Sequence, residues 1–173
     1  MICLEGKTIG LRNSELLIII PAYNESGNIE KTIKMIEEHT PEFDYVIIND
    51  CSTDHTLEIC RNNNFNVIDL PINLGIGGAV QTGYQYAVKN GYQYAVQVDG
   101  DGQHNPEFIR KMLQVLQEKN VNMVIGSRFI ENQGFQSSLA RRIGISFFEK
   151  LIKILTGQKV TDPTSGLRVA DRK

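Results

Sequence analysis

The chain has 173 residues, which is enough for one compact domain and short for two. Eighteen basic and 20 acidic residues give a formal net charge of −2, so no general positive field favours nucleic acid as a partner. An apolar content of 41% with five prolines argues against a disordered chain. The three cysteines lack the spacing of a zinc site or a disulfide framework and favour a reducing cytoplasm. No stretch approaches the roughly 18 apolar residues of a membrane span, and the N-terminus lacks the pattern of a signal peptide.

Short apolar runs alternate with segments that have helical spacing along the whole chain. We expect strands at 16–20, 45–48, 65–70, 94–98 and 123–125, helices opening at 26–28 and at Thr53 or Asp54, helices at 75–90, 106–119 and 139–155, and an extended segment at 159–169. Pro21 is expected to stop the first strand, because proline cannot donate to a sheet. The alternation predicts an α/β fold with a mostly parallel sheet in a single domain over 1–173, after an N-terminal extension at 1–15.

In a sheet of this kind, ligands bind beyond the carboxyl ends of the strands. The residues that directly follow each predicted strand are therefore the candidates for function. They are 21–25, 50–54, 71–78, 99–104 and 126–129.

The most specific of these segments is Asp-Gly-Asp-Gly-Gln-His at 99–104. Asp99 and Asp101 are one residue apart, and the glycines let the backbone turn sharply, as a hard divalent cation requires. Mg²⁺ or Mn²⁺ held there neutralises charge on a leaving nucleoside diphosphate. The plainer alternative is a turn with capping aspartates, and His104 is equally a ligand or a solvated neighbour.

Two further loops carry groups that suit a nucleoside. Tyr23 and Glu25 follow the first strand and offer an aromatic face and a carboxylate. Asp50 follows the second strand and is able to accept from a base or a ribose hydroxyl, whereas Thr53 and Asp54 are better explained as caps of the next helix. The alternative for the first loop is an ordinary connection in which Glu25 favours a helix start.

The glycines after the third strand, in Asn-Leu-Gly-Ile-Gly-Gly-Ala at 73–79, open a helix. Small residues such as Gly78 let a ligand approach, and the free amides of the first turn favour anions. The segment is not the dinucleotide fingerprint, because Val80 occupies the third glycine position and the loop follows the third strand.

Six motifs in order, PAYNE, NDCSTD, NLGIGGA, DGDGQH, GSRF and DPTSGLR, resemble those of the inverting family 2 glycosyltransferases. The resemblance covers about residues 16–170. It is strongest to the branch that holds dolichyl-phosphate mannose synthase and bacterial polyprenyl-phosphate sugar transferases. It implies a nucleotide-binding fold of the GT-A type and transfer of a hexose from UDP-sugar or GDP-mannose to a polyprenyl phosphate, with inversion.

The resemblance also implies roles for individual residues. Pro21, Tyr23 and Glu25 would line the nucleoside pocket with Asp50 near the base, Asp99 would contact nucleotide and metal, and Asp101 and Gln103 would hold the cation.

Three more residues follow from the same resemblance. Arg128 would meet a phosphate, and Arg142 would do so toward an acceptor phosphate; surface solubility is the alternative for both. Asp162 is the remaining candidate base, although a phosphate acceptor is already anionic and needs little deprotonation. Asp162 would then orient the acceptor or nearby basic residues.

The segment 139–156 is a basic amphipathic helix by its pattern. It would either pack on the core or lie in a membrane interface beside a lipid acceptor, which would make the protein peripheral on the cytoplasmic membrane face. Because relatives continue with further helices, we expect the sequence to be truncated after Lys173.

Four other readings stay open at this point. They are transfer to a soluble or polysaccharide acceptor, a nucleotidyltransferase, a phosphatase, and a domain that binds a nucleotide sugar without catalysis. The loop after the first strand lacks the glycine-rich basic character of nucleotidyltransferases, and the Asp-x-Asp motif follows the fourth strand, whereas phosphatases of that type carry it after the first.

Overall fold

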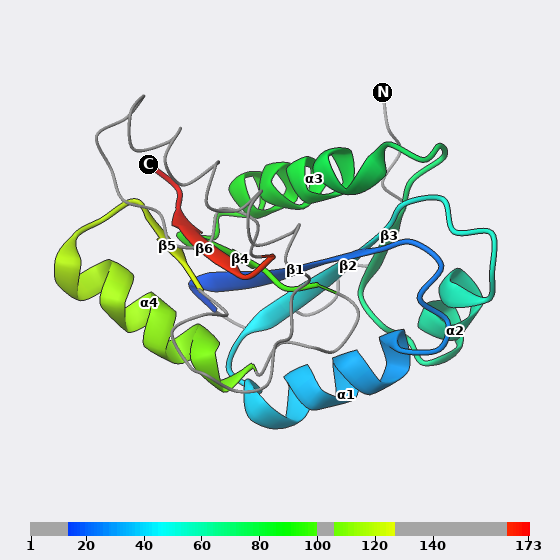
Figure 1. Ribbon diagram of the computed structural model, residues 1–173, viewed down its shortest axis with the longest axis horizontal. Helices are drawn as coiled ribbons and strands as arrows, with labels where there is room; N and C mark the ends of the chain where they lie inside the picture. Colours follow the sequence, from blue (N-terminus) through cyan, green and yellow to red (C-terminus); the bar gives the residue numbers. More distant parts are fainter. Residues whose placement is uncertain (1–13, 100–105, 127–165) are drawn as a thin grey trace, which may run out of the picture.

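The computed structural model describes residues 14–99, 106–126 and 166–173 (Figure 1). The elements in chain order are β1 (Leu16–Ala22), α1 (Ile29–His39), β2 (Asp44–Asn49), α2 (Thr56–Asn62), β3 (Val67–Asp69), α3 (Gly75–Lys89), β4 (Tyr94–Gln97), α4 (Glu107–Lys119), β5 (Met123–Ile125) and β6 (Arg168–Asp171). The expected helix at 139–155 and most of the expected extended segment lie outside the described residues.

The strands form one six-stranded sheet in the order β3-β2-β1-β4-β6-β5. Strands β1 to β4 pair in parallel, whereas β6 is antiparallel to both β4 and β5. The predicted α/β fold with a mostly parallel sheet is therefore confirmed. The chain order reverses between β1 and β4, and in open α/β sheets such a reversal point is where ligands bind, outside the carboxyl ends of the strands.

Strand β1 is the centre of the core, and all seven of its residues are buried. Because side chains alternate along a strand, Leu16, Ile18 and Ile20 face one side of the sheet, and Leu17 and Ile19 face the other. Helices α1, α2 and α4 cover the first side, and α3 packs on the second (Figure 1). The unbroken apolar run is thus explained by a strand with helices on both faces.

The prediction that Pro21 ends β1 is wrong for one neighbour of the strand. Pro21 is paired with Ile48 of β2, and the Asp50 amide donates to the Ala22 carbonyl beyond it at 2.9 Å. On the other side, pairing with β4 ends at Ile19, whose carbonyl accepts from the Val98 amide at 3.0 Å. Alternate residues point to the same neighbour, so the N–H that proline lacks would have faced β4. Pro21 therefore ends pairing with β4 only.

Two helix starts differ from the sequence prediction. Helix α1 begins at Ile29, because residues before it form a turn in which the amides of Asn28 and Ile29 both donate to the Glu25 carbonyl. Helix α2 begins at Thr56, and the Asp54 carboxylate accepts from its amide at 2.9 Å. The N-cap residue of α2 is His55, so the prediction that Thr53 or Asp54 occupies that position is wrong, although Asp54 does bond the first amide of the helix. Among the described residues, no helix is long and apolar enough to cross a membrane.

The contact between α3 and β1 depends on Gly83, which generates the first prediction. A Cβ at Gly83 would overlap the side chain of Ile19, whereas a Cβ at Gly77 on the same helix would meet nothing within 4 Å. We expect Gly83→Ala to lower the free energy of unfolding by about 1–3 kcal/mol through overpacking, despite alanine's better helix propensity. The matched variant Gly77→Ala should raise it by up to about 1 kcal/mol. Urea unfolding of both variants tests this, and equal stabilities would contradict it.

Candidate functional site

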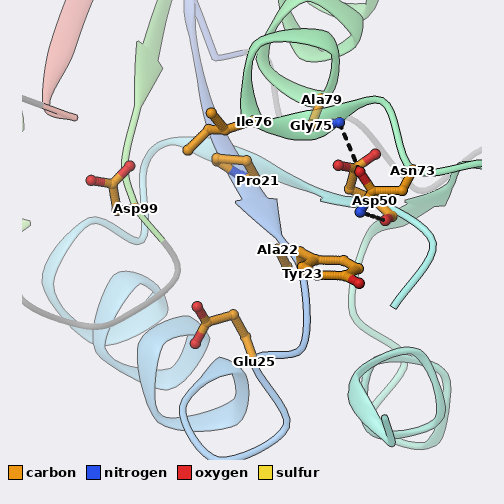
Figure 2. Close-up of a pocket in the computed structure, with 10 residues that line it drawn as sticks. All are labelled: Pro21, Ala22, Tyr23, Glu25, Asp50, Asn73, Gly75, Ile76, Ala79 and Asp99. Carbon is orange, nitrogen blue, oxygen red and sulfur yellow. Dashed lines mark hydrogen bonds between the residues drawn. The ribbon is translucent and has the colours of Figure 1, made fainter. Parts of the chain in front are cut away.

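The loops that follow β1, β2, β3 and β4 meet at the carboxyl edge of the sheet and enclose a cavity of about 450 Å³. It is lined by Pro21, Ala22, Tyr23, Glu25, Asp50, Asn73, Gly75, Ile76, Ala79 and Asp99 (Figure 2). The cavity thus brings together five predicted site residues from three separate segments of the sequence: Pro21, Tyr23, Glu25, Asp50 and Asp99. The cavity lies at the reversal point between β1 and β4, where Pro21 separates the two strands.

Asp50 is a fixed part of the cavity wall. Asp50 is only 2% exposed, and one of its carboxylate oxygens accepts a hydrogen bond from the Leu74 backbone amide at 2.7 Å. The Asn73 side chain donates to the Asp50 carbonyl at 3.2 Å and accepts from the Gly75 amide at 3.0 Å (Figure 2). Because Gly75 has a φ of 73°, the chain turns here in a way that other residues rarely adopt. Asp50 is therefore held at the start of α3 before any ligand arrives.

Two more carboxylates, those of Asp99 and Glu25, line the cavity besides Asp50. In Figure 2, Asp99 at the end of β4 is on the side opposite Asp50, and Glu25 lies between the two sides, below. The Gln97 side chain donates to Asp99 at 3.3 Å, and the Asn28 side chain donates to Glu25 at 3.1 Å. Tyr23 is 48% exposed, so its ring is available to stack on a planar group.

The loops after β1 and β2 are joined by hydrogen bonds between side chains and backbone. Asn24, with a φ of 57°, accepts from the Thr53 amide at 2.8 Å, and its own amide donates to the Ser52 hydroxyl at 3.0 Å. The Glu25 amide donates to the Thr56 hydroxyl at 2.8 Å, and the Ser26 amide donates to Asp54 at 3.1 Å. These bonds fix Tyr23 and Glu25 relative to Asp50.

Asp54 is the most strongly bonded carboxylate of this pair of loops. Partial burial raises its pKa, but the hydrogen bonds from Thr56 and Ser26 together outweigh that effect and hold the pKa well below the usual range. The ionised form is therefore favoured by the folded loops, and its stabilising effect depends on pH.

The remaining predicted residues divide into two groups. Gly78 is not among the residues that line the cavity, and a Cβ there would meet the Leu74 side chain on the preceding turn. The same helix start lines the cavity with Gly75, Ile76 and Ala79 instead. The other predicted residues lie outside the described residues: Asp101, Gln103, His104, Arg128, Arg142 and Asp162.

A hard divalent cation requires several oxygen ligands. The described residues contain no group of three or more His, Cys, Asp or Glu side chains that could hold a metal ion. Asp99 and Glu25 do bring carboxylate oxygens to the cavity wall, and oxygen is the donor that Mg²⁺ and Mn²⁺ prefer. These two donors therefore fit a hard divalent cation, with the rest of the Asp-Gly-Asp motif next in sequence after Asp99.

Sequence reasoning missed three residues that shape the site. Asn73 supports Asp50 through both ends of its side chain, and Ile76 and Ala79 form the apolar wall. Asn73 offered a signal, since asparagine before a glycine-rich helix start is a common turn residue. Asn24 was within a motif, but its role depends on bonds to the loop after β2.

The mostly parallel α/β sheet flanked by helices is a fold of the GT-A type, and its acidic cavity lies where such open sheets bind ligands. The glycosyl transferase family 2 profile matches residues 17–173, and the chain belongs to that family. The predicted resemblance is thereby confirmed.

Two curated relatives that are named for different activities are similar to this chain in sequence. One is an undecaprenyl-phosphate mannosyltransferase of Micrococcus luteus, 30% identical over 88% of this chain and 65% of its own length. Another is a UDP-N-acetylglucosamine–dolichyl-phosphate N-acetylglucosaminyltransferase of Methanococcus voltae, 33% identical over 88% of this chain and 68% of its own. The chain spans about two thirds of the length of such relatives.

Among solved structures, glucosyl-3-phosphoglycerate synthase of Mycobacterium tuberculosis, crystallised with Mn²⁺, UDP-glucose and phosphoglyceric acid, has the same fold. The TM-score is 0.68 at 20% identity, over 92% of this chain and 57% of that one. At this identity the likeness establishes the fold.

The bonds around Asp54 generate the second prediction. We expect Asp54→Asn to lower the free energy of unfolding by about 1 kcal/mol at pH 7, as loss of a charged cap does. Because the folded-state pKa is depressed, the contribution of Asp54 is complete above its unfolded pKa of about 4 and is lost as pH falls below it. The difference between wild type and variant should therefore shrink below about pH 4.

Urea unfolding from pH 7 to pH 2.5 measures this difference. Thr53→Ala is the matched control, because Thr53 is exposed in the same loop and its hydroxyl makes only a 3.3 Å bond to Asn24. A difference between wild type and Asp54→Asn that is independent of pH would contradict the assignment.

Proposed function

We propose that the protein transfers a hexose from a nucleoside diphosphate sugar to an acceptor, with inversion at the anomeric carbon. The observation that carries the proposal is the cavity at the reversal point, with Asp50 fixed on one side and Asp99 on the other. Its volume of about 450 Å³ is within the range of small-molecule sites. Family membership supports the same chemistry.

The nucleoside would bind between the loops after β1 and β2. Tyr23 offers a ring for stacking, and Pro21 and Ile76 give apolar contact. Asp50 would accept a hydrogen bond from the base with the carboxylate oxygen that Leu74 does not use, and Glu25 would accept from the ribose. The diphosphate would then extend toward Asp99.

A divalent cation, Mg²⁺ or Mn²⁺, would be held by Asp99 together with Asp101 and Gln103. When bound, it supplies charge that balances the developing negative charge of the departing diphosphate. Asp99 itself would bind and orient the cation and the diphosphate. Its position is fixed because it follows a buried strand and accepts a hydrogen bond from Gln97. Arg128 would add a guanidinium toward a phosphate.

We propose a polyprenyl phosphate as the acceptor, with Arg142 binding its phosphate. The names of the Micrococcus and Methanococcus relatives support this acceptor. A phosphate oxygen attacks the anomeric carbon while the bond from that carbon to the diphosphate breaks, and the nucleoside diphosphate leaves with the electron pair. Asp162 would orient the acceptor, since this oxygen carries no proton near neutral pH. Segment 139–156 would lie on the cytoplasmic membrane face beside the lipid.

The nucleotide panel is the third prediction. UDP, GDP, CDP and ADP are each added with Mn²⁺ or with EDTA, and the melting temperature is recorded. We expect one diphosphate to stabilise the wild type in the presence of metal, because a ligand that binds only the folded state raises apparent stability. Asp101→Ala should remove the dependence on metal, and Asp50→Ala should weaken binding with and without metal.

Glu58→Ala is the control for this panel, since Glu58 is an exposed residue on α2 away from the cavity. If no diphosphate raises the melting temperature of the wild type in the presence of metal, the proposed function is wrong. Binding of the donor without transfer or hydrolysis would instead support a domain that binds without catalysis.

The acceptor is the subject of the fourth prediction. With the donor identified by the panel, transfer is measured to a short-chain polyprenyl phosphate in anionic vesicles and to soluble acceptors, including phosphoglyceric acid. We expect the labelled sugar of the donor to appear in the lipid phase. We also expect the protein to float with the vesicles, because 139–156 has a basic amphipathic pattern. Transfer to a soluble acceptor without flotation would refute the lipid acceptor and leave the sugar transfer intact.

A further inference from the structure

Strand β6 brings a distant part of the chain to the proposed metal site. It is antiparallel to β4, with Gln97 opposite Arg168. The N-terminal end of β6 therefore lies at the carboxyl edge of the parallel strands. Continuing the same register puts Gly166 opposite Asp99. In an antiparallel pair, opposite residues on one face have Cβ atoms about 4.5–5.5 Å apart, so a side chain at 166 would lie directly against that of Asp99.

Gly166 leaves the space that the Asp99 carboxylate fills. The three atoms nearest to a Cβ built on Gly166 are the carboxylate carbon and both carboxylate oxygens of Asp99, all closer than real Cβ atoms come. Gly75 and Gly91 differ from it, because each has a positive φ and nothing within 4 Å of a built Cβ. What Gly166 contributes is room beside a carboxylate.

The backbone of Gly166 is held more firmly than the carboxylate of Asp99. Leu167 is 5% exposed and Val169 is fully buried, and the Gly126 amide donates to the Leu167 carbonyl at 2.9 Å, so the backbone at the start of β6 is anchored. Asp99 accepts from Gln97, which is itself 8% exposed. A methyl group at 166 would therefore displace the carboxylate of Asp99 and leave the strand in place.

We propose that Gly166 is a positioning residue, which sets the place of the Asp99 carboxylate and through it the metal-dependent part of nucleotide binding. The inference rests on the proposed function, since it assigns Asp99 to the metal and the diphosphate. Changing a residue that orients a metal ligand typically lowers metal affinity by about 10–100-fold. The nucleoside end at Asp50 is not touched by Gly166 and should be unaffected.

The test measures the dissociation constant of the nucleotide that the wild type binds, with Mn²⁺ and with EDTA, by titration calorimetry. Gly166→Ala should weaken binding about tenfold or more with Mn²⁺, and should leave binding in EDTA unchanged. Gly27→Ala is the control, because Gly27 is exposed, does not line the cavity, and a Cβ there would meet nothing within 4 Å. Equal constants for the two variants with Mn²⁺ would overturn the inference.

A second measurement covers a variant that folds poorly. If the Asp99 carboxylate is what the new methyl group displaces, the melting temperature lost in Gly166→Ala should be recovered in the double variant Asp99→Ala with Gly166→Ala. No recovery would overturn the inference even if nucleotide binding is weakened. A wild type without metal-dependent binding would overturn the proposed function, whereas normal wild-type binding with no specific effect of Gly166→Ala would overturn only this inference.

Discussion

The missing N–H of Pro21 is the constraint on which the cavity depends. Strand β1 keeps its pairing with β2 through Ala22, but its pairing with β4 ends at Ile19. Since the proline has no donor for β4, the two central strands separate before the buried run of β1 ends. The loops that follow them then diverge, and the space between Asp50 and Asp99 opens at the point where the order of the strands reverses.

The side of that space formed by Asp50 is held by local polar bonds. Asn24 and Asp54 join the loops after β1 and β2, and Asn73 joins the loop after β2 to the start of α3. Most of these bonds pair a side chain with a backbone amide or carbonyl that no strand or helix satisfies. They explain why polar residues are concentrated in these three loops: each satisfies a backbone group that would otherwise be left unpaired beside the cavity.

The sequence allowed the strands and the ligand-binding edge to be predicted, because buried parallel strands have unbroken apolar runs and binding residues follow them. It predicted Asp50 and Asp99 for the same reason. The continuation of β1 through Pro21 was missed, since the side of the sheet to which a proline lacks a donor is a property of pairing. Asn24 and Gly166 were missed because their partners, Thr53 and Asp99, are distant in the chain and come together only in the fold.

The two ends of the proposed donor site are therefore supported by different means. Asp50 depends on hydrogen bonds between residues of 50–75, the single stretch from the end of β2 to the start of α3. Asp99 depends on β6, which is antiparallel and comes from the far end of the sequence. An antiparallel strand inserted beside β4 is the arrangement that lets a late segment approach the carboxyl edge with its first residues, because a parallel strand there would have presented its last. The proposed base-binding and metal-binding halves of the site would thus be separable, since changes near β6 lie beside Asp99 and not beside Asp50.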